Sequence, residues 1–342
     1  MAEYLYGLDL DELKAAFKKI NEPAFRAQQM ADWIYKKHII DIKEAKNFST
    51  ELIKKISETF SLFALQHAQT NESSNHESKK FLFKTLEGQF IESVLIAQQD
   101  RRTVCVSTQV GCKIGCSFCA SGKGKFGRNL TPGEIVEQVA YIERLIGEKV
   151  TNIVYMGMGE PLDNFEATMK SLQILQADWG FELGARRITV STSGITPKIL
   201  EFVSRSEGRV RLSVSLHSSD EMRRSELVPI NKKYSLAELK KTLFQIHKKL
   251  KRDITFEYTV IAGVNDSLEE AEGVARMAIP LQAKVNLIPF NPIKEAHYKS
   301  PTEEQVEKFK RALERRGVRV IVRQTAGRDI DAACGQLARR AS

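Results

Sequence analysis

Apolar residues recur at two different spacings along this chain, and the change of spacing divides it into two parts. Between residues 8 and 60 they recur every three to four positions, which predicts short amphipathic helices with a break at Asn21, Glu22 and Pro23. From residue 103 onward, short β-branched runs alternate with helical patterns. The strand-like runs cover residues 103–108, 152–156, 187–191, 209–215, 255–261, 284–289 and 318–323. Seven strands with intervening helices predict a parallel α/β sheet or barrel.

The helical patterns between these strands carry recognisable start signals. Thr131, Pro132 and Glu134 combine an N-cap residue, a proline at the first helical position and a glutamate three residues after the cap. Further helices are expected over residues 165–177, 197–204, 235–250, 267–279 and 302–316.

The segment between the two parts has few apolar residues. We expect residues 67–79 to form a linker or an exposed turn, followed by a hairpin whose strands cover 80–85 and 89–97. The chain would then consist of a helical accessory domain (1–75), a hairpin that links it to the core (80–98), a barrel core (99–330) and a C-terminal tail (331–342).

Polar and often glycine-bearing segments follow several of the predicted strands. They begin at Thr108, Met156, Ser191, Ser215 and Pro289. Because the carboxyl ends of parallel strands converge on one face of a barrel, these segments should lie together. We therefore expect a barrel whose chemistry takes place on this rim.

The composition is that of a globular protein, with 342 residues of which 42% are hydrophobic and 28% charged. Its longest apolar runs fall far short of the roughly 18 residues that a membrane span needs. The first residues lack the basic flank and apolar core of a secretory signal. We therefore expect a soluble, cytoplasmic protein and, since no heptad pattern occurs, a monomer.

The formal net charge is +9, and its distribution is uneven. Residues 1–60 carry ten basic and ten acidic side chains, whereas residues 101–130 carry six basic side chains and no acidic one. A second basic block covers residues 231–252. Two such blocks favour a polyanionic partner, although the second could also be an ordinary solvated helix face.

Three of the five cysteines form a compact group, Cys112, Cys116 and Cys119, with the spacing C-x3-C-x2-C. An odd number of cysteines, three of them within eight residues, is a poor disulfide framework. Three thiolates on one loop can hold three irons of a four-iron cluster and leave the fourth iron open. A structural zinc site would need a fourth Cys or His, and this loop offers none. Phe118 could shield such a cluster from solvent.

This loop resembles the C-x3-C-x-F-C motif of radical S-adenosylmethionine (radical SAM) enzymes. In these enzymes the open iron of a 4Fe–4S cluster binds SAM, and reductive cleavage yields a 5′-deoxyadenosyl radical. Other segments resemble the RlmN/Cfr group of RNA adenine methyltransferases, and the match extends from about residue 88 to residue 337. These segments begin at Thr108, Met156, Ser191, Ser215, Val228, Asn286 and Asp329. Pro161 and the segment from Asn231 to Tyr234 are more similar to RlmN than to Cfr.

The resemblance implies a partial (β/α) barrel of the radical SAM type, preceded by the small helical domain. It also implies methylation at C2 of one adenine in 23S ribosomal RNA and of adenine 37 in transfer RNA. Each turnover would use two SAM molecules, the 4Fe–4S cluster and a reductant such as flavodoxin. One departure from the family is Ser121, where threonine is more usual; serine keeps the hydroxyl group.

Three residues outside the cysteine loop receive catalytic roles from the resemblance. Cys334 would carry a methyl group taken from SAM, and Cys105 would later attack the Cys334 sulfur, which leaves a transient disulfide. Glu92 would remove the C2 proton. From the residues alone, Cys334 could be an ordinary buried thiol, Cys105 a core residue of a strand and Glu92 a solvated side chain.

The resemblance also assigns SAM contacts to the segments that follow the strands. These residues are Gly159, Glu160, Ser191, Ser215, Leu216, His217 and Asn291. Glu160 would hold the amino group of SAM and Asn291 would contact its adenine, whereas a turn at Gly159 and a core position for His217 are the ordinary alternatives. Two other functions stay open: methylation at C8, as in Cfr, and a non-catalytic iron–sulfur or zinc module that binds RNA. The basic blocks would contact the RNA, and the target adenine would have to leave its stack.

Overall fold

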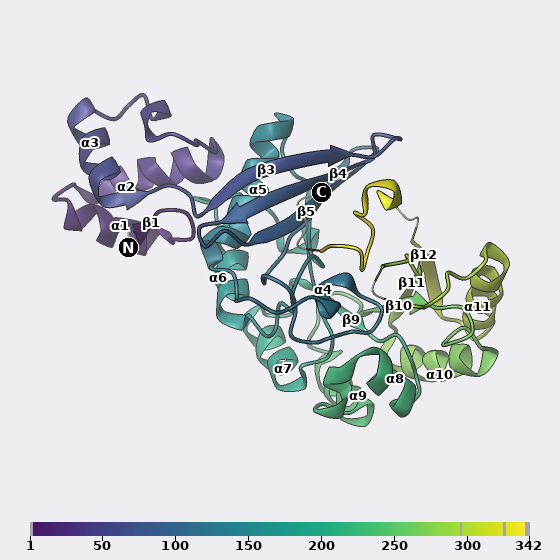
Figure 1. Ribbon diagram of the computed structural model, residues 1–342. Coiled ribbons are helices and arrows are strands. Elements are labelled where there is room, and N and C mark those ends of the chain that lie inside the picture. Colours follow the sequence, from purple (N-terminus) through teal and green to yellow (C-terminus); the bar gives the residue numbers. More distant parts are fainter. Residues whose placement is uncertain (1–2, 295, 324–325, 339–342) are drawn as a thin grey trace.

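The computed structural model describes residues 3–294, 296–323 and 326–338. Its N-terminal part is helical, as the apolar spacing predicted (Figure 1). It contains α1 (Leu10–Lys19), α2 (Ala24–Ala31), η1 (Asp32–Lys36), η2 (Ile42–Glu44) and α3 (Thr50–Thr59). Two short strands, β1 (Glu3–Tyr4) and β2 (Phe60–Ser61), pair in parallel and bring the two ends of this part together. A capping box at Asp9 and Glu12 begins α1.

The core is a ten-stranded sheet in which all seven predicted parallel strands are present. These are β6 (Arg101–Cys105), β7 (Asn152–Tyr155), β8 (Ile188–Thr192), β9 (Arg211–Ser215), β10 (Thr255–Val260), β11 (Lys284–Pro289) and β12 (Arg319–Val322). They lie side by side in chain order, and β6 is also antiparallel to β5 (Phe90–Gln98). Within the described residues the strand pairing does not close on itself, so the sheet is the partial barrel that was expected.

The expected linker over 67–79 is wrong in its first half, because β3 (Leu65–Glu72) is a strand of the main sheet. It pairs with β4 (Ser78–Thr85), which forms the predicted hairpin with β5. Only Leu65 is buried in β3, and the rest of the strand alternates between partly buried and exposed positions. A strand with one solvated face contains few apolar residues, which explains the error. The domain boundary near residue 75 stays a prediction.

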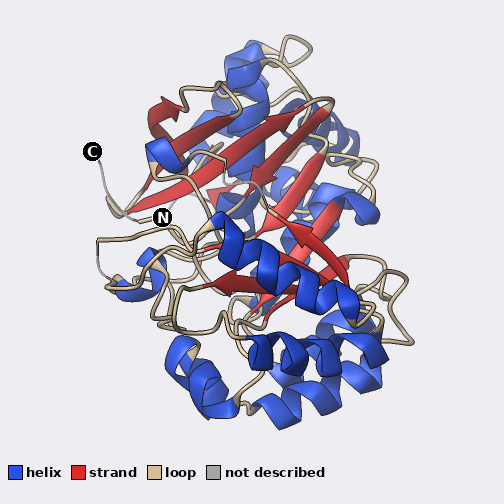
Figure 2. Cartoon of the chain, turned by 90° about the vertical axis from the view of Figure 1, so that its right-hand side faces the viewer, coloured by secondary structure: helices blue, strands red, loops and turns tan. Residues whose placement is uncertain are grey.

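Helices cover the outer side of the parallel strands (Figures 1 and 2). These are α5 (Pro132–Ile146), α6 (Phe165–Gln176), α7 (Thr196–Arg205), α8 (Glu221–Leu227), α9 (Leu236–Ile246), α10 (Leu268–Ala278) and α11 (Glu303–Arg315). Shorter helical turns are α4 (Ala120–Lys123), η3 (Ala185–Arg187), η4 (Pro229–Lys232), η5 (Ile279–Leu281) and η6 (Arg328–Ile330). Thr131 and Glu134 form the predicted capping box of α5. Among the described residues, no helix has both the length and the apolar character that crossing a bilayer requires.

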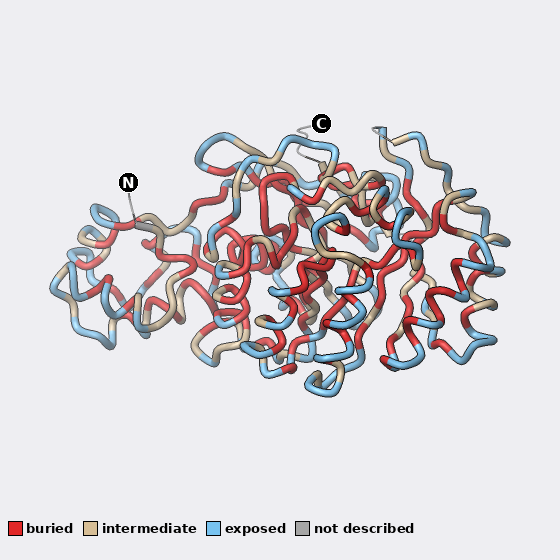
Figure 3. Tube along the Cα trace, turned by 90° about the horizontal axis from the view of Figure 1, so that it is seen from below, coloured by how far each residue is buried: buried red, intermediate tan, exposed pale blue. Residues whose placement is uncertain are grey.

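One hydrophobic core extends from the N-terminal helices into the barrel, and buried stretches occur in both parts (Figure 3). The contact between the parts includes a buried carboxylate: Glu137 of α5 accepts hydrogen bonds from the backbone N–H groups of Ala64 (3.0 Å) and Leu65 (2.7 Å). Burial raises the pKa of Glu137 to about 8, and these two hydrogen bonds oppose the rise. The chain segment that enters the main sheet is thus fixed to the barrel helix α5.

Candidate functional site

Two adjoining cavities lie around the carboxyl ends of the parallel strands. The larger, of about 470 Å³, is bounded by β5, β6, β12 and the C-terminal segment, and we call it the Cys334 cavity. The smaller, of about 160 Å³, is bounded by the cysteine loop and the ends of β7 to β11, and we call it the strand-end cavity. Cys119, Met156, Arg323 and Cys334 line both cavities. The rim that the sequence predicted as the site is therefore hollow.

The three clustered cysteines, Cys112, Cys116 and Cys119, all line the strand-end cavity. Burial raises the pKa of the Cys116 thiol, and the charges of the other two sulfurs add to the rise. Among the described residues, no three Cys, His, Asp or Glu side chains converge on a single point as ligands of one metal ion would. A four-iron cluster does not require this, because each thiolate binds a different iron. The three thiols on one cavity wall therefore fit such a cluster.

Glu160 lies at the bottom of the strand-end cavity and is buried. Its carboxylate accepts hydrogen bonds from the backbone N–H and the hydroxyl of Ser193, both at 2.7 Å, and from the backbone N–H of Leu162 at 3.0 Å. Burial raises its pKa, and these donors oppose the rise. Gly159 has φ +101°, and a Cβ there would lie 2.6 Å from Cβ of Gln109. The turn that delivers Glu160 to the cavity therefore requires glycine.

Ser191 and Ser215, near the ends of β8 and β9, line the same cavity. Leu216 differs from them, because its side chain is fully buried in the core. Its backbone groups are engaged instead: the N–H donates to the carbonyl of Glu257 at 3.0 Å, and the carbonyl accepts from Arg224 at 3.1 Å.

His217 lines the strand-end cavity from a left-handed backbone conformation, with φ +58°. Its Nδ1 accepts a hydrogen bond from the backbone N–H of Thr259 at 2.9 Å, and its ring lies against Phe118 with 4.6 Å between the centroids. Burial, assisted by the charge of Arg224, lowers the pKa of His217 to about 3. The imidazole is therefore neutral near pH 7, and Nε2–H is the donor that remains.

Asn291 lines the Cys334 cavity and contacts the backbone of Cys334. Its side-chain N–H donates to the Cys334 carbonyl at 3.2 Å, whereas its Oδ1 is buried and has no hydrogen-bond partner among the described residues. Gly335 is also held, since its carbonyl accepts from the backbone N–H of Ala120 at 2.8 Å. The segment that carries Cys334 is thus tied to the end of the cysteine loop.

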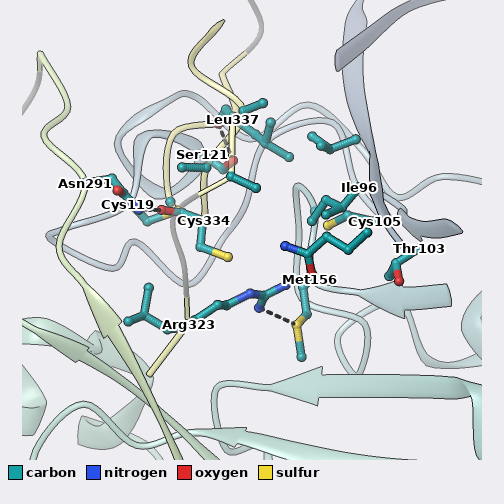
Figure 4. A pocket seen from close by; sticks show the side chains of 18 of the residues that line it. Ile96, Thr103, Cys105, Cys119, Ser121, Met156, Asn291, Arg323, Cys334 and Leu337 are labelled. Atoms are coloured by element: carbon teal, nitrogen blue, oxygen red, sulfur yellow. Dashed lines mark hydrogen bonds between the residues drawn. The ribbon is translucent and has the colours of Figure 1, made fainter. Parts of the chain in front are cut away.

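Cys105 and Cys334 face each other across the Cys334 cavity (Figure 4). Burial raises the pKa of Cys105 to about 12; negative charge at Cys334 adds to the rise, and Arg323 opposes it. All five cysteines lie within the described residues and are free thiols. The disulfide bond that the resemblance implied is therefore absent from this structure.

Glu92 lies in the middle of β5 and is 2% exposed, so it is not the solvated side chain that a lone strand glutamate usually is. Lys80 lies 3.1 Å from its carboxylate, and the backbone N–H of Ala338 donates to the carboxylate at 2.7 Å. Burial raises the pKa of Glu92, and Lys80 opposes the rise. The structure therefore brings Glu92 to the C-terminal segment that contains Cys334. The last four residues of the predicted tail, 339–342, lie outside the described residues.

Two arginines at the site were missed in the sequence. Arg323 directly follows β12, lines both cavities and donates a long hydrogen bond, 3.8 Å, to the sulfur of Met156 (Figure 4). It occupies the same position after a strand as the other site residues, so the strand pattern could have identified it. Arg224 of α8 is fully buried beneath the strand-end cavity. Nothing in its sequence surroundings distinguishes it from the neighbouring Arg223.

The first basic block is only partly available to a polyanion, whereas every lysine and arginine side chain of the second block is exposed. In the first block, Lys113 pairs with Asp163 at 3.1 Å, while Lys123 and Lys125 are exposed near the cysteine loop. In the second block, Lys251 and Arg252 are exposed just before β10 begins. They therefore lie near the amino ends of the strands, opposite the cavities.

Comparison with known proteins matches both parts of the chain to described families. Residues 106–278 match the Radical SAM superfamily, and residues 4–62 match the Ribosomal RNA large subunit methyltransferase N-terminal domain.

Individual proteins match nearly the whole chain. The "Probable dual-specificity RNA methyltransferase RlmN" of Clostridium perfringens (strain SM101 / Type A) is 43% identical over 330 residues, which cover 96% of this chain and 95% of that protein. A protein of the same name from Bacillus licheniformis is 43% identical over 336 residues, 97% of this chain and 92% of its own. The crystal structure of a radical SAM methyltransferase from Sphaerobacter thermophilus has a TM-score of 0.95 and 42% identity, and covers 99% of this chain and 100% of its own.

Proposed function

The chain belongs to the radical SAM superfamily and, within it, to the RlmN family, and we propose that it methylates C2 of an adenine in 23S ribosomal RNA and C2 of adenine 37 in transfer RNA. Support for RNA as substrate comes from the name of its relatives and from the match of residues 4–62. The words "dual-specificity" in that name support two classes of RNA.

Cys112, Cys116 and Cys119 would hold a 4Fe–4S cluster in the strand-end cavity, where all three thiols face the same space. When bound, this cluster supplies the electron that cleaves SAM to a 5′-deoxyadenosyl radical. Glu160 would hold the amino group of SAM, with Gly159 permitting the close approach of backbone. Ser191, Ser215 and the backbone of Leu216 would contact the rest of the SAM molecule.

His217 and Asn291 would complete the SAM site. The Nε2–H of His217 is a donor on the wall of the strand-end cavity, since Nδ1 already accepts from Thr259. The Oδ1 of Asn291 is a buried acceptor with no partner among the described residues, as an amino group of adenine would require.

The observation that carries the mechanism is that Cys334 lines both cavities. Its thiolate would attack the methyl group of one SAM molecule, so that an S–CH₃ bond forms on Cys334 and S-adenosylhomocysteine leaves. The radical derived from a second SAM would then abstract hydrogen from that methyl group. The resulting carbon would add to C2 of the adenine and tether the RNA to Cys334.

Glu92 and Cys105 would complete the turnover. Glu92 would accept the C2 proton, and its burial with a raised pKa is appropriate for a base that works near neutral pH. The radical adduct would first return one electron to the cluster that cleaved SAM. The Cys105 thiolate would then attack the Cys334 sulfur, so that an S–S bond forms and the S–C bond to the RNA breaks. The released CH₂ carbon would take up a proton to become the C2 methyl group, and a cellular thiol would reduce the Cys105–Cys334 disulfide. The positions of both sulfurs on facing walls support the attack by Cys105.

The proposal places the reaction in the cytoplasm, with the chain acting as a monomer and a reductant such as flavodoxin supplying electrons. The exposed Lys123 and Lys125 would contact the RNA beside the site, and the N-terminal helical domain would contribute to the choice of substrate. The target adenine would have to leave its stack to reach Cys334.

Analysis of the nucleosides formed tests the proposal. The chain is loaded with iron and sulfide without oxygen, then incubated with SAM, a reductant and unmodified 23S or transfer RNA. We expect 2-methyladenosine from both RNAs, and none from the Cys334→Ala variant. Formation of 8-methyladenosine would instead establish the reaction of Cfr. Binding of RNA with neither SAM cleavage nor a methylated product would establish a non-catalytic module.

A further inference from the structure

Arg224 has no role in the proposed mechanism, yet it donates several hydrogen bonds to the backbone at the strand ends of the site. Its guanidinium donates to the carbonyls of Ser193 (2.8 Å), Ser215 (3.0 Å) and Leu216 (3.1 Å). Ser193 directly follows β8, Ser215 is the last residue of the neighbouring strand β9, and Leu216 directly follows it. The planar guanidinium thus fixes two separate backbone segments relative to each other.

The same hydrogen bonds reach Glu160 through one intermediate residue. The carbonyl of Ser193 accepts a hydrogen bond from Arg224, and the backbone N–H and hydroxyl of Ser193 donate to the Glu160 carboxylate. A change at Arg224 would therefore move Ser193 and with it the orientation of Glu160. Arg224 also holds the carbonyl of Leu216, directly before the left-handed residue His217.

Neighbouring residues are arranged around this guanidinium. Asn231 accepts from Arg224 at 2.5 Å, and its own N–H groups donate to the carbonyl and carboxylate of Glu221 and to the hydroxyl of Ser225. Gly194 has φ +113°, and a Cβ there would lie 3.3 Å from the guanidinium. Asn231 and Gly194 thus both lie against the guanidinium of Arg224.

We propose that Arg224 is a positioning residue for SAM: it fixes the backbone of Ser193, Ser215 and Leu216 in the conformation that binds SAM. This inference rests on the proposed function and extends it to a residue that does not itself line either cavity.

Arg224→Lys keeps the charge but loses the planar set of donors, whereas Arg224→Met loses both. Arg223→Lys is the matched control, since Arg223 is the preceding residue and its ion pair with Glu270, at 2.8 Å, can be kept by lysine. The proteins are loaded with the cluster to matched iron content, and SAM binding is measured by calorimetry.

For both Arg224→Lys and Arg224→Met we expect a SAM dissociation constant at least about tenfold above that of Arg223→Lys, because hydrogen bonds from a charged group are lost. Melting temperatures identify any general loss of structure. An Arg224→Lys protein that binds SAM within twofold of the control would overturn the inference.

Asn231→Ala provides a second route if both Arg224 variants fail to fold. It removes only the side chain that orients Arg224, so SAM binding should weaken in the same direction by a smaller factor. Unchanged affinity in Asn231→Ala would then overturn the inference. If the wild-type chain loads its cluster but binds no SAM, the proposed function itself is overturned. This result differs from failure of the inference on Arg224, because the Arg223→Lys control would then also bind no SAM.

Discussion

The backbone N–H of Ala338 donates a 2.7 Å hydrogen bond to the carboxylate of Glu92, 246 residues earlier in the chain. Ala338 lies four residues after Cys334, so this bond draws the segment that carries Cys334 toward β5. It engages one oxygen of the carboxylate that we propose as the base, while Lys80 lies 3.1 Å from the other oxygen.

The first prediction concerns the cysteine loop. Cys116→Ala should prevent loading of the cluster and abolish SAM cleavage, because two remaining thiolates cannot hold the three irons. Iron content and the visible absorption of the reconstituted protein provide the measurement. Cys105→Ala is the control, since it removes a thiol outside the loop and should retain the iron. Full iron content in Cys116→Ala would refute the assignment of the ligand.

The second prediction concerns Glu92. In Glu92→Gln, Cys334 should still become methylated, but RNA methylation should slow by about a hundredfold or more, as expected on loss of a general base. Glu87→Gln is the control, because Glu87 lies in the turn of the same hairpin, pairs with Arg128 and should leave the rate unchanged.

The pH dependence gives an independent check on Glu92. A base must be ionised, and burial raises the pKa of Glu92, so the single-turnover rate should increase as the pH rises through that raised pKa. Glu92→Gln should lack this increase. The same pH profile in both proteins would assign the proton transfer to another group.

The third prediction concerns Cys105. Cys105→Ala should complete addition to the RNA but fail to break the S–C bond, so that protein and RNA stay covalently joined. A denaturing gel with labelled RNA measures the joined species. Thr103→Ala, which alters the same wall of the Cys334 cavity, should release free product. Free methylated RNA from Cys105→Ala at the normal rate would exclude the role of Cys105.

The fourth prediction concerns stability and Glu137. Its folded pKa, about 8, lies above the ordinary value of about 4.3, so between these two values the folded chain holds a proton that the unfolded chain has lost. The free energy of unfolding should therefore fall as the pH rises through this window, by at most about 1.4 kcal/mol per pH unit from this group. Glu137→Gln cannot ionise at this position, so its free energy of unfolding, measured by urea denaturation, should depend less on pH.

Glu58→Gln is the control for this measurement, because Glu58 is an exposed residue of α3. Its profile should follow that of the wild type. A wild-type profile that does not fall between about pH 4.5 and pH 8 relative to Glu137→Gln would mean that Glu137 stays ionised in its buried position.

Local patterns in the sequence predicted the parallel strands, because their short β-branched runs contrast with the amphipathic helices between them. They could not predict β3, whose outward face is polar. Cys112, Cys116 and Cys119 were predictable since one short loop holds them all. Contacts between distant segments were not predictable in the same way. The hydrogen bond from Ala338 to Glu92 and those from Arg224 to backbone carbonyls join residues from separate segments, and such contacts produce no local sequence pattern.

The central claim is that Cys334 carries the methyl group, and the mass of the peptide containing Cys334 tests it most directly. The cluster-loaded protein is incubated without oxygen with SAM whose methyl group is deuterated, then digested and analysed. We predict that this peptide gains one deuterated methyl group and that the peptide containing Cys105 gains none. An unmodified Cys334 in a protein with an intact cluster that cleaves SAM would contradict the account, and the methyl group would then have to reach the RNA by another route.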